Sequence, residues 1–87
     1  MHEHSLINNL ISKIVRLAKK EQATTVTRVC IKLGALSHMS ASHFREHFDI
    51  SAKGTIAEKA ILDVEESHDV DDPDAQAILL KSVDVSS

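Results

Sequence analysis

An α+β fold, with two helices packed on one face of a three-stranded sheet in the order α-β-α-β-β, is predicted by three features of the sequence. Apolar residues recur at helical spacing over residues 5–20 and 41–53. Apolar and polar residues alternate, as in strands, over residues 24–33, 58–66 and 77–85. Each helical segment has a single apolar stripe, so we expect both helices to cover the same face of the sheet.

The first helix is predicted by the longest regular apolar pattern in the chain. Ser5 can cap its N-terminus, and Lys19 and Lys20 suit the negative end of the helix dipole. The stripe that should face the sheet consists of Ile7, Leu10, Ile11, Ile14, Leu17 and Ala18.

The second helix is predicted by two phenylalanines four residues apart. Phe44 and Phe48 should point inward, on the same face as Ala52. Ser40 is the expected N-cap, and Gly54 is expected to end the helix.

The strands are predicted by alternation, and their connections by loop length. In the first strand, the residues expected to face the core are Thr27, Val29, Ile31 and Leu33. The residues expected on the open face are Val26, Arg28, Cys30 and Lys32. In the third strand the alternation slips between Leu79 and Lys81, which predicts a bulge or a twisted edge. The last two strands are joined by a short polar loop, so we expect them to pair antiparallel.

Composition narrows the classes of function. The 87 residues suffice for a single domain, 1–87, and the net charge of -3 gives no basic surface for nucleic acid. Cys30 is the only cysteine, which suits the reducing cytoplasm and excludes zinc sites built from cysteine pairs. No apolar run reaches the roughly 18 residues that span a bilayer, so no membrane association is expected. No phosphate-binding glycine loop or nucleophile motif is present, and we expect no enzyme.

The first residues of the chain carry candidate metal ligands. The bulk of His2 should prevent removal of Met1, so that a free α-amine lies close to the His2 imidazole. The Met1 amine, the His2 amide nitrogen and the His2 ring nitrogen can close adjacent chelate rings around one ion. Nickel(II) and copper(II) accept such planar nitrogen ligands, whereas zinc, calcium and magnesium do not. A frayed terminus with an accidental histidine is the simpler alternative, and Glu3 can equally be an acid favoured by the helix dipole.

The sequence also resembles a known family. The stretch MHEHSLINNLISKIV resembles the opening of the HypA/HybF-type nickel metallochaperones of NiFe-hydrogenase maturation. The similarity continues through VTRVCIKLGALSHMSASHF and FDISAKGTIAEKAILDVEE, and the final AILLKSVDV resembles the closing strand of the family. The resemblance implies nickel bound by Met1, His2 and Glu3, with His4 and His38 as further candidates. It also implies a non-enzymatic protein that works with a hydrogenase maturation GTPase and delivers nickel to the hydrogenase large subunit.

One part of the sequence departs from that family. Its members carry a zinc-binding lobe with two Cys-x-x-Cys pairs between the last two strands. Here the loop 67–76, SHDVDDPDAQ, holds no cysteine, so we expect no zinc. The functions of that lobe, including target recognition, are therefore in doubt for this chain.

Other ligand-type residues have plain structural interpretations. His43 and His47 stand four apart on the second helix and can share a metal ion, although surface histidines are the simpler interpretation. The acidic loop 67–76 lacks the glycine and the closing glutamate of an EF-hand, so it is interpreted as a solvated hairpin loop. His38 lies in a turn, where polar residues are ordinary, and Cys30 is interpreted as an inert residue of the sheet.

A second hypothesis is a metal-independent interaction module or a dimerising scaffold. It depends on an open sheet face that carries Val26, Cys30 and Ile61. A homodimer, including one formed by strand exchange after the shortened connection, would use that face or the rejoined strands.

Overall fold

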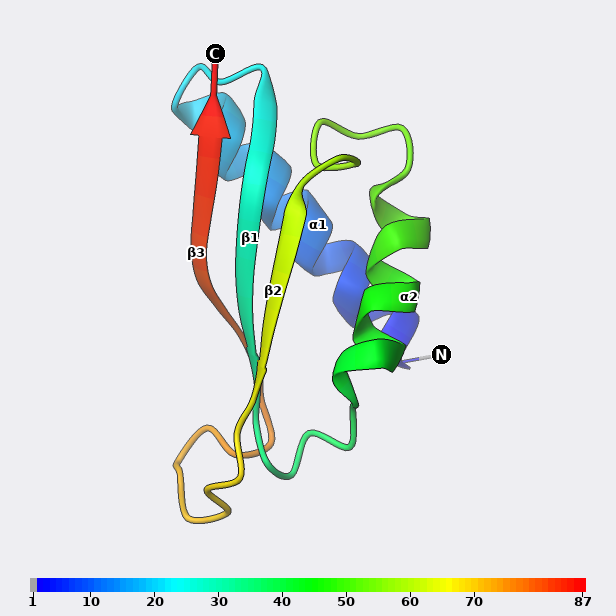
Figure 1. The fold of residues 1–87 in the computed structure, drawn as a ribbon, viewed down its shortest axis with the longest axis vertical. Coiled ribbons are helices and arrows are strands. Elements are labelled where there is room, and N and C mark those ends of the chain that lie inside the picture. The colour runs from blue at the N-terminus through cyan, green and yellow to red at the C-terminus, as the bar shows by residue number, and fades with distance from the viewer. Residues whose placement is uncertain (1) are drawn as a thin grey trace.

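The predicted order of elements is confirmed by the structure, a computed structural model that describes the backbone of residues 2–87 and the side chains from Ser5 onward. Two helices lie on one face of a three-stranded sheet (Figure 1). The elements are α1 (His2–Lys20), β1 (Thr25–Leu33), α2 (Ala41–Ala52), β2 (Ile61–Glu66) and β3 (Ile78–Ser86). Within residues 2–87, no helix is both long and apolar enough to cross a membrane.

The predicted pairing of the last two strands is wrong. The sheet order is β2-β1-β3, so β1 lies in the centre and separates the strands that were expected to be neighbours. β2 pairs parallel with β1, and β3 pairs antiparallel with β1 on the other side. The physical reason is the β1–α2–β2 crossover, in which a helix between two strands returns the chain to the same edge and places the strands parallel.

The core lies between the helices and the inner face of the sheet. From the helices, Ile7, Ile14, Phe44 and Phe48 are at most 1% exposed. The phenylalanine rings lie 6.0 Å apart, centroid to centroid. The strand residues that pack against this group are Val26, Val29, Ile31, Leu33 and Leu62. The core is thus aliphatic apart from two rings.

Two irregularities in the β1–β3 pairing change which side chains are buried. Between Val26 and Arg28 the register shifts, so Thr27 is an extra residue on β1. Val26 is consequently buried and Thr27 exposed, which is the reverse of the prediction from strict alternation. A second shift leaves Lys81 as the extra residue on β3, which confirms the bulge predicted there.

The helix ends follow the expected chemistry at α2 and at the C-terminus of α1, where Lys19 and Lys20 lie in the last turn, but not at the N-terminus of α1. Ser40 is the N-cap of α2, where its hydroxyl accepts a hydrogen bond from the His43 amide at 3.2 Å. Gly54, with φ of 80°, follows the end of α2 in the left-handed conformation that glycine tolerates. α1 begins at His2, so Ser5 lies inside the helix and is not its cap.

Candidate metal centre

The predicted nickel ligands lie at the start of α1. Met1 and the side chains of His2, Glu3 and His4 lie outside the described residues, so the ligand geometry stays a prediction. The structure does show that α1 begins at His2. The first amides of a helix have no carbonyl partner within the helix. A metal ion that binds the His2 amide nitrogen therefore breaks no hydrogen bond of α1.

The start of α1 is held in place by the core. Ile7 and Ile11 are 0% and 5% exposed, one and two turns after the first helical residue. They belong to the same buried cluster as Phe44 and Phe48 of α2. The two helices are in contact, and the first turns of α1 run beside α2 (Figure 1). The packing thus holds this end of α1 at a defined position next to α2.

His38, a lower-ranked candidate ligand, lies in the turn that precedes α2. It is exposed and has φ of 60°, a left-handed conformation that is uncommon for a residue with a side chain. Its neighbours Ser37 and Met39 line a hollow shared with Leu6 and Leu10 of α1. The turn that carries His38 therefore lies against the first half of α1, although no described contact joins His38 to a second ligand-type side chain.

His43 and His47 are brought together on one side of α2. Their ring centroids lie 4.6 Å apart, with an angle of 36° between the ring planes. His43 is exposed and His47 is half-buried, because the adjacent Phe44 and Phe48 take the positions that face the core. The helical spacing predicted this proximity, and the structure adds that the rings lie side by side.

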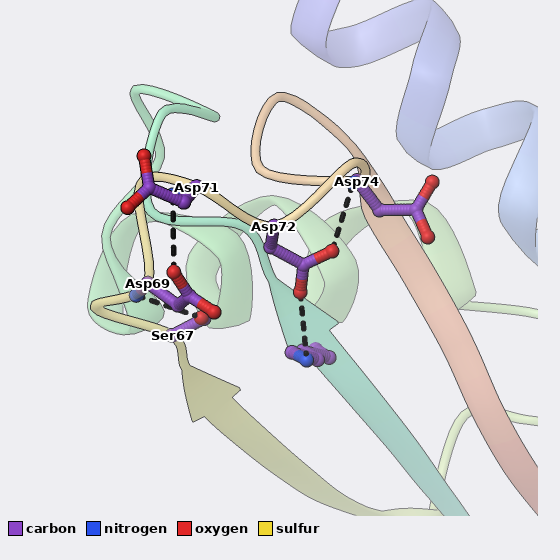
Figure 2. Close-up of polar contacts among 6 residues, drawn as sticks. Ser67, Asp69, Asp71, Asp72 and Asp74 are labelled. Carbon is purple, nitrogen blue, oxygen red and sulfur yellow. Dashed lines mark hydrogen bonds and ion pairs between the residues drawn. The ribbon is translucent and has the colours of Figure 1, made fainter.

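In the acidic loop the Asp69 and Asp72 carboxylates act as turn acceptors (Figure 2). The Asp71 amide donates to the Asp69 carboxylate at 3.0 Å, and the Asp74 amide donates to the Asp72 carboxylate at 2.9 Å. The Ser67 hydroxyl accepts from the Asp69 amide at 3.3 Å. These are the short-range turns that aspartate and serine favour, and Figure 2 shows the four carboxylates pointing in different directions. The solvated-loop interpretation fits this arrangement, but the loop closes no hairpin, because β2 and β3 do not pair.

Asp72 also ties the loop to the central strand. The Lys32 ammonium of β1 lies 3.4 Å from the Asp72 carboxylate. The hydrogen bond from the Asp74 amide and the charge of Lys32 hold the pKa of Asp72 below its ordinary value, against a smaller opposing effect of desolvation. Sequence reasoning missed this pair, because Lys32 and Asp72 are 40 residues apart.

The same loop crosses the end of β1. The Gly34 amide donates to the Ala77 carbonyl at 2.9 Å, and the Leu36 amide donates to the Ala75 carbonyl at 2.7 Å. Gly34 faces the Ala75 backbone so closely that a Cβ atom at Gly34 would overlap the Ala75 carbonyl. Glycine is therefore required here for close approach of two backbones.

The open face of the sheet is more polar than the interaction hypothesis assumed. Arg28 of β1 forms an ion pair with Asp63 of β2 at 3.0 Å, and the Cys30 thiol lies 3.8 Å from the same carboxylate. Val26, which was expected on this face, is buried. Ile61 does lie exposed there, at 57%. An apolar docking surface built on Val26 is therefore excluded, whereas the homodimer stays an untested prediction.

Among the residues whose side chains the structure describes, no group of three or more histidine, cysteine, aspartate or glutamate side chains is arranged to hold a metal ion. Neither the acidic loop nor the histidines of α2 form a complete ligand set by themselves. The start of α1 thus keeps its place as the candidate nickel site.

Comparison with known proteins identifies the family. Residues 1–70 match the family described as "Hydrogenase/urease nickel incorporation, metallochaperone, hypA". The chain is 38% identical over 64 residues to the hydrogenase maturation factor HypA of Archaeoglobus fulgidus, an alignment that covers 74% of this chain and 58% of that relative. It is 37% identical over 65 residues to HypA of Methylocella silvestris, with coverage of 75% and 58%.

The fold agrees with solved structures of that family. The solution structure of the Ni metallochaperone HypA from Helicobacter pylori superposes with a TM-score of 0.80 at 21% identity, over 98% of this chain and 97% of that chain. At such low identity the superposition supports the fold alone. The sequence alignments show that the chain spans about 58% of the length of the two relatives above. The match over residues 1–70 nevertheless covers most of this chain, which therefore belongs to the HypA family of nickel-incorporation metallochaperones.

Proposed function

We propose that this chain binds one nickel ion at its N-terminus and passes it on in the maturation of a hydrogenase. The observation that carries the proposal is the family match, which begins at residue 1 and so includes the Met1-His2-Glu3 stretch. The recipient proposed from the family resemblance is the large subunit of a NiFe-hydrogenase, and the proposed helper is a maturation GTPase. Members of this family are metallochaperones rather than enzymes, and we propose the same for this chain.

The proposed ligands are three nitrogen atoms from two residues, with Glu3 as the neighbouring acid. The Met1 amine, the His2 amide and the His2 imidazole would close adjacent chelate rings around a planar nickel ion. The positive end of the α1 dipole disfavours a cation, but loss of the His2 amide proton and the charge of Glu3 offset that repulsion. Met1, His2 and Glu3 are thus proposed as the metal site, with His4 and His38 as lower-ranked additions.

Protonation of these nitrogen ligands can also release the nickel ion. Amine and imidazole nitrogens bind metal only after losing their protons, so nickel affinity should fall as the pH falls. A site made from one short stretch at the chain terminus also leaves the ion open to an incoming ligand of a recipient protein. This combination suits a protein that carries nickel rather than keeps it.

The loop 67–76 is proposed to stand where other family members carry their zinc lobe. The family match ends at residue 70, inside this loop. β3 follows at Ile78 and completes the sheet beside β1, so the fold closes across the short connection. We therefore propose a nickel-binding domain without bound zinc, in which recognition of partners uses surfaces other than a zinc lobe.

A nickel titration followed by absorbance tests the N-terminal site. We expect about one equivalent of nickel and a band typical of a planar, nitrogen-rich complex. Both should disappear in His2→Ala, which removes the chelating imidazole, and in a chain acetylated at Met1, which removes the chelating amine. His68→Ala, in the exposed loop, is the matched control and should leave the band unchanged. A band that survives both N-terminal changes would refute the proposed site.

A further inference from the structure

We propose that His43 and His47 of α2 form a second metal site, which chelates a divalent first-row transition metal ion through their two imidazoles. The proposal goes beyond the N-terminal nickel site, because it uses different residues and needs no free amine. It begins from the spacing: residues four apart on a helix lie one above the other on the same side.

The ring geometry supports the chelate. The centroids of the two imidazoles are 4.6 Å apart and their planes are tilted by 36°. The rings are therefore already neighbours, and the proposed chelate forms when side-chain rotation directs one nitrogen of each toward a common point. Neutral imidazole is a good ligand for copper, nickel and zinc, and copper(II) binds most tightly in the general order of divalent ions.

The packing of α2 fixes the side of the helix on which the two rings lie. Phe44 and Phe48 are at most 1% exposed and set the rotation of the helix about its axis. His43 and His47 each precede one of these phenylalanines, so they occupy the rim of the buried face. Ser40 caps the helix by accepting from the His43 amide at 3.2 Å, which orders the turn that carries the first ligand. The two ligands are thus displayed on a rigid element.

His43 lies in the first turn of α2, whose positive dipole end weakly disfavours a cation, and chelation by two imidazoles is proposed to outweigh this effect. Arg45 is the only lysine or arginine within Ala41–Ala52. Its guanidinium donates to the Leu62 carbonyl of β2 at 2.7 Å, so this charge is held toward the sheet. Among the side chains from Ser5 onward, no third histidine, cysteine or acidic side chain completes a ligand group, so the proposed chelate consists of the two imidazoles. A two-ligand chelate suits reversible binding of the ion.

The test uses copper(II) as the probe and a chain in which the N-terminal site is disabled by acetylation of Met1 together with His2→Gln and His4→Gln. We expect this chain to bind one copper ion, with an electron paramagnetic resonance spectrum that shows coupling to imidazole nitrogen. His43→Gln or His47→Gln should abolish that binding, whereas His38→Gln and His68→Gln should not. Because the N-terminal amine and both N-terminal imidazoles are absent throughout, failure of the nickel site would leave this result unaffected.

A matched variant separates the chelate from mere histidine content. Ser42→His combined with His43→Gln keeps two histidines on α2 but destroys the spacing of four residues. We expect it to lose copper binding while its circular dichroism spectrum stays that of the folded chain. Copper binding that persists in this variant, or in His43→Gln, would overturn the proposal, as would loss of binding in His68→Gln.

Discussion

The start of α1 and the loop 67–76 are both rich in residues of metal-binding type. They differ in whether the donor atoms of those residues already take part in hydrogen bonds or ion pairs within the fold. In the loop, the Asp69 and Asp72 carboxylates accept backbone hydrogen bonds, and Asp72 also pairs with Lys32. At the start of α1, the helix itself leaves its first amides without a partner within the helix. The comparison teaches that ligand-type residues indicate a site only when the fold leaves their donors available. The Asp69 and Asp72 carboxylates stabilise turns, whereas the terminal amine, the His2 amide and the His2 imidazole are the donors of the proposed chelate.

The largest effect expected from this comparison is on nickel uptake. The triple change Asp69→Asn, Asp71→Asn and Asp74→Asn removes three loop carboxylates and should leave the nickel stoichiometry at about one. His2→Ala removes a single imidazole and should abolish high-affinity binding, because the chelate ring that joins the His2 amide nitrogen to the imidazole is lost. Equilibrium dialysis with nickel alone measures both. Loss of nickel in the triple variant would show that the loop, and not the start of α1, supplies the ligands.

The next largest effect should be the loss of folding stability in Gly34→Ala, a substitution that tests the contact between the loop and β1. The added methyl group would overlap the Ala75 carbonyl where the loop crosses β1. Relief requires movement of backbone, so we expect a loss of about 3 kcal/mol in the free energy of unfolding, at the upper end of typical overpacking costs. Urea denaturation at pH 7 measures it.

Gly54 provides the control for that substitution. A methyl group at Gly54 would meet no atom within 4 Å, although its φ of 80° makes alanine there strained as well. We expect Gly54→Ala to cost less, about 1 kcal/mol, since only backbone conformation is affected. Equal losses at Gly34 and Gly54 would contradict the close approach of the loop to β1.

A smaller effect is expected at the start of α2. Ser40→Ala removes the hydroxyl that accepts from the His43 amide and should lower the free energy of unfolding by about 1 kcal/mol. Ser5→Ala is the comparison, because Ser5 lies inside α1 and does not cap it. Alanine at position 5 should be neutral or slightly stabilising. Thermal unfolding of the two variants would distinguish these outcomes, and a larger loss in Ser5→Ala would refute the assignment of the caps.

The smallest effect expected is a pH dependence from Asp72. Its pKa is held below the ordinary value of 3.8 in the folded chain, chiefly by the Asp74 amide and then by Lys32. A depressed pKa stabilises the folded chain above the unfolded pKa, and the stabilisation is lost as the pH falls through the folded pKa. Asp72→Asn should therefore lose slightly less stability than the parent chain between pH 6 and about pH 2. Asp71→Asn is the control, because Asp71 contributes its amide rather than its carboxylate to the turn.

Short-range sequence patterns were enough to predict much of the fold but little of the site geometry. The apolar spacing of Ile7, Ile11 and Ile14 is enough to predict α1, because only a helix places these residues on one side. The chemistry of Met1 and His2 could likewise be argued from their neighbouring nitrogen atoms. In contrast, Lys32 and Asp72 form an ion pair across 40 residues, and no local pattern reports a contact at that separation.

By itself, then, the sequence determined the five elements, the cap at Ser40, the turn at Gly54 and the ligand types at the start of the chain. Hydrophobic periodicity, hydroxyl capping and glycine geometry act over a few residues, so they are visible in the order of residues alone. Only the tertiary structure decided that β1 lies between β2 and β3, and that the bulge at Thr27 turns Val26 into the core. Alternation reports which residues share a face, but the partner and register of a strand depend on the crossover through α2 and on contacts between distant segments.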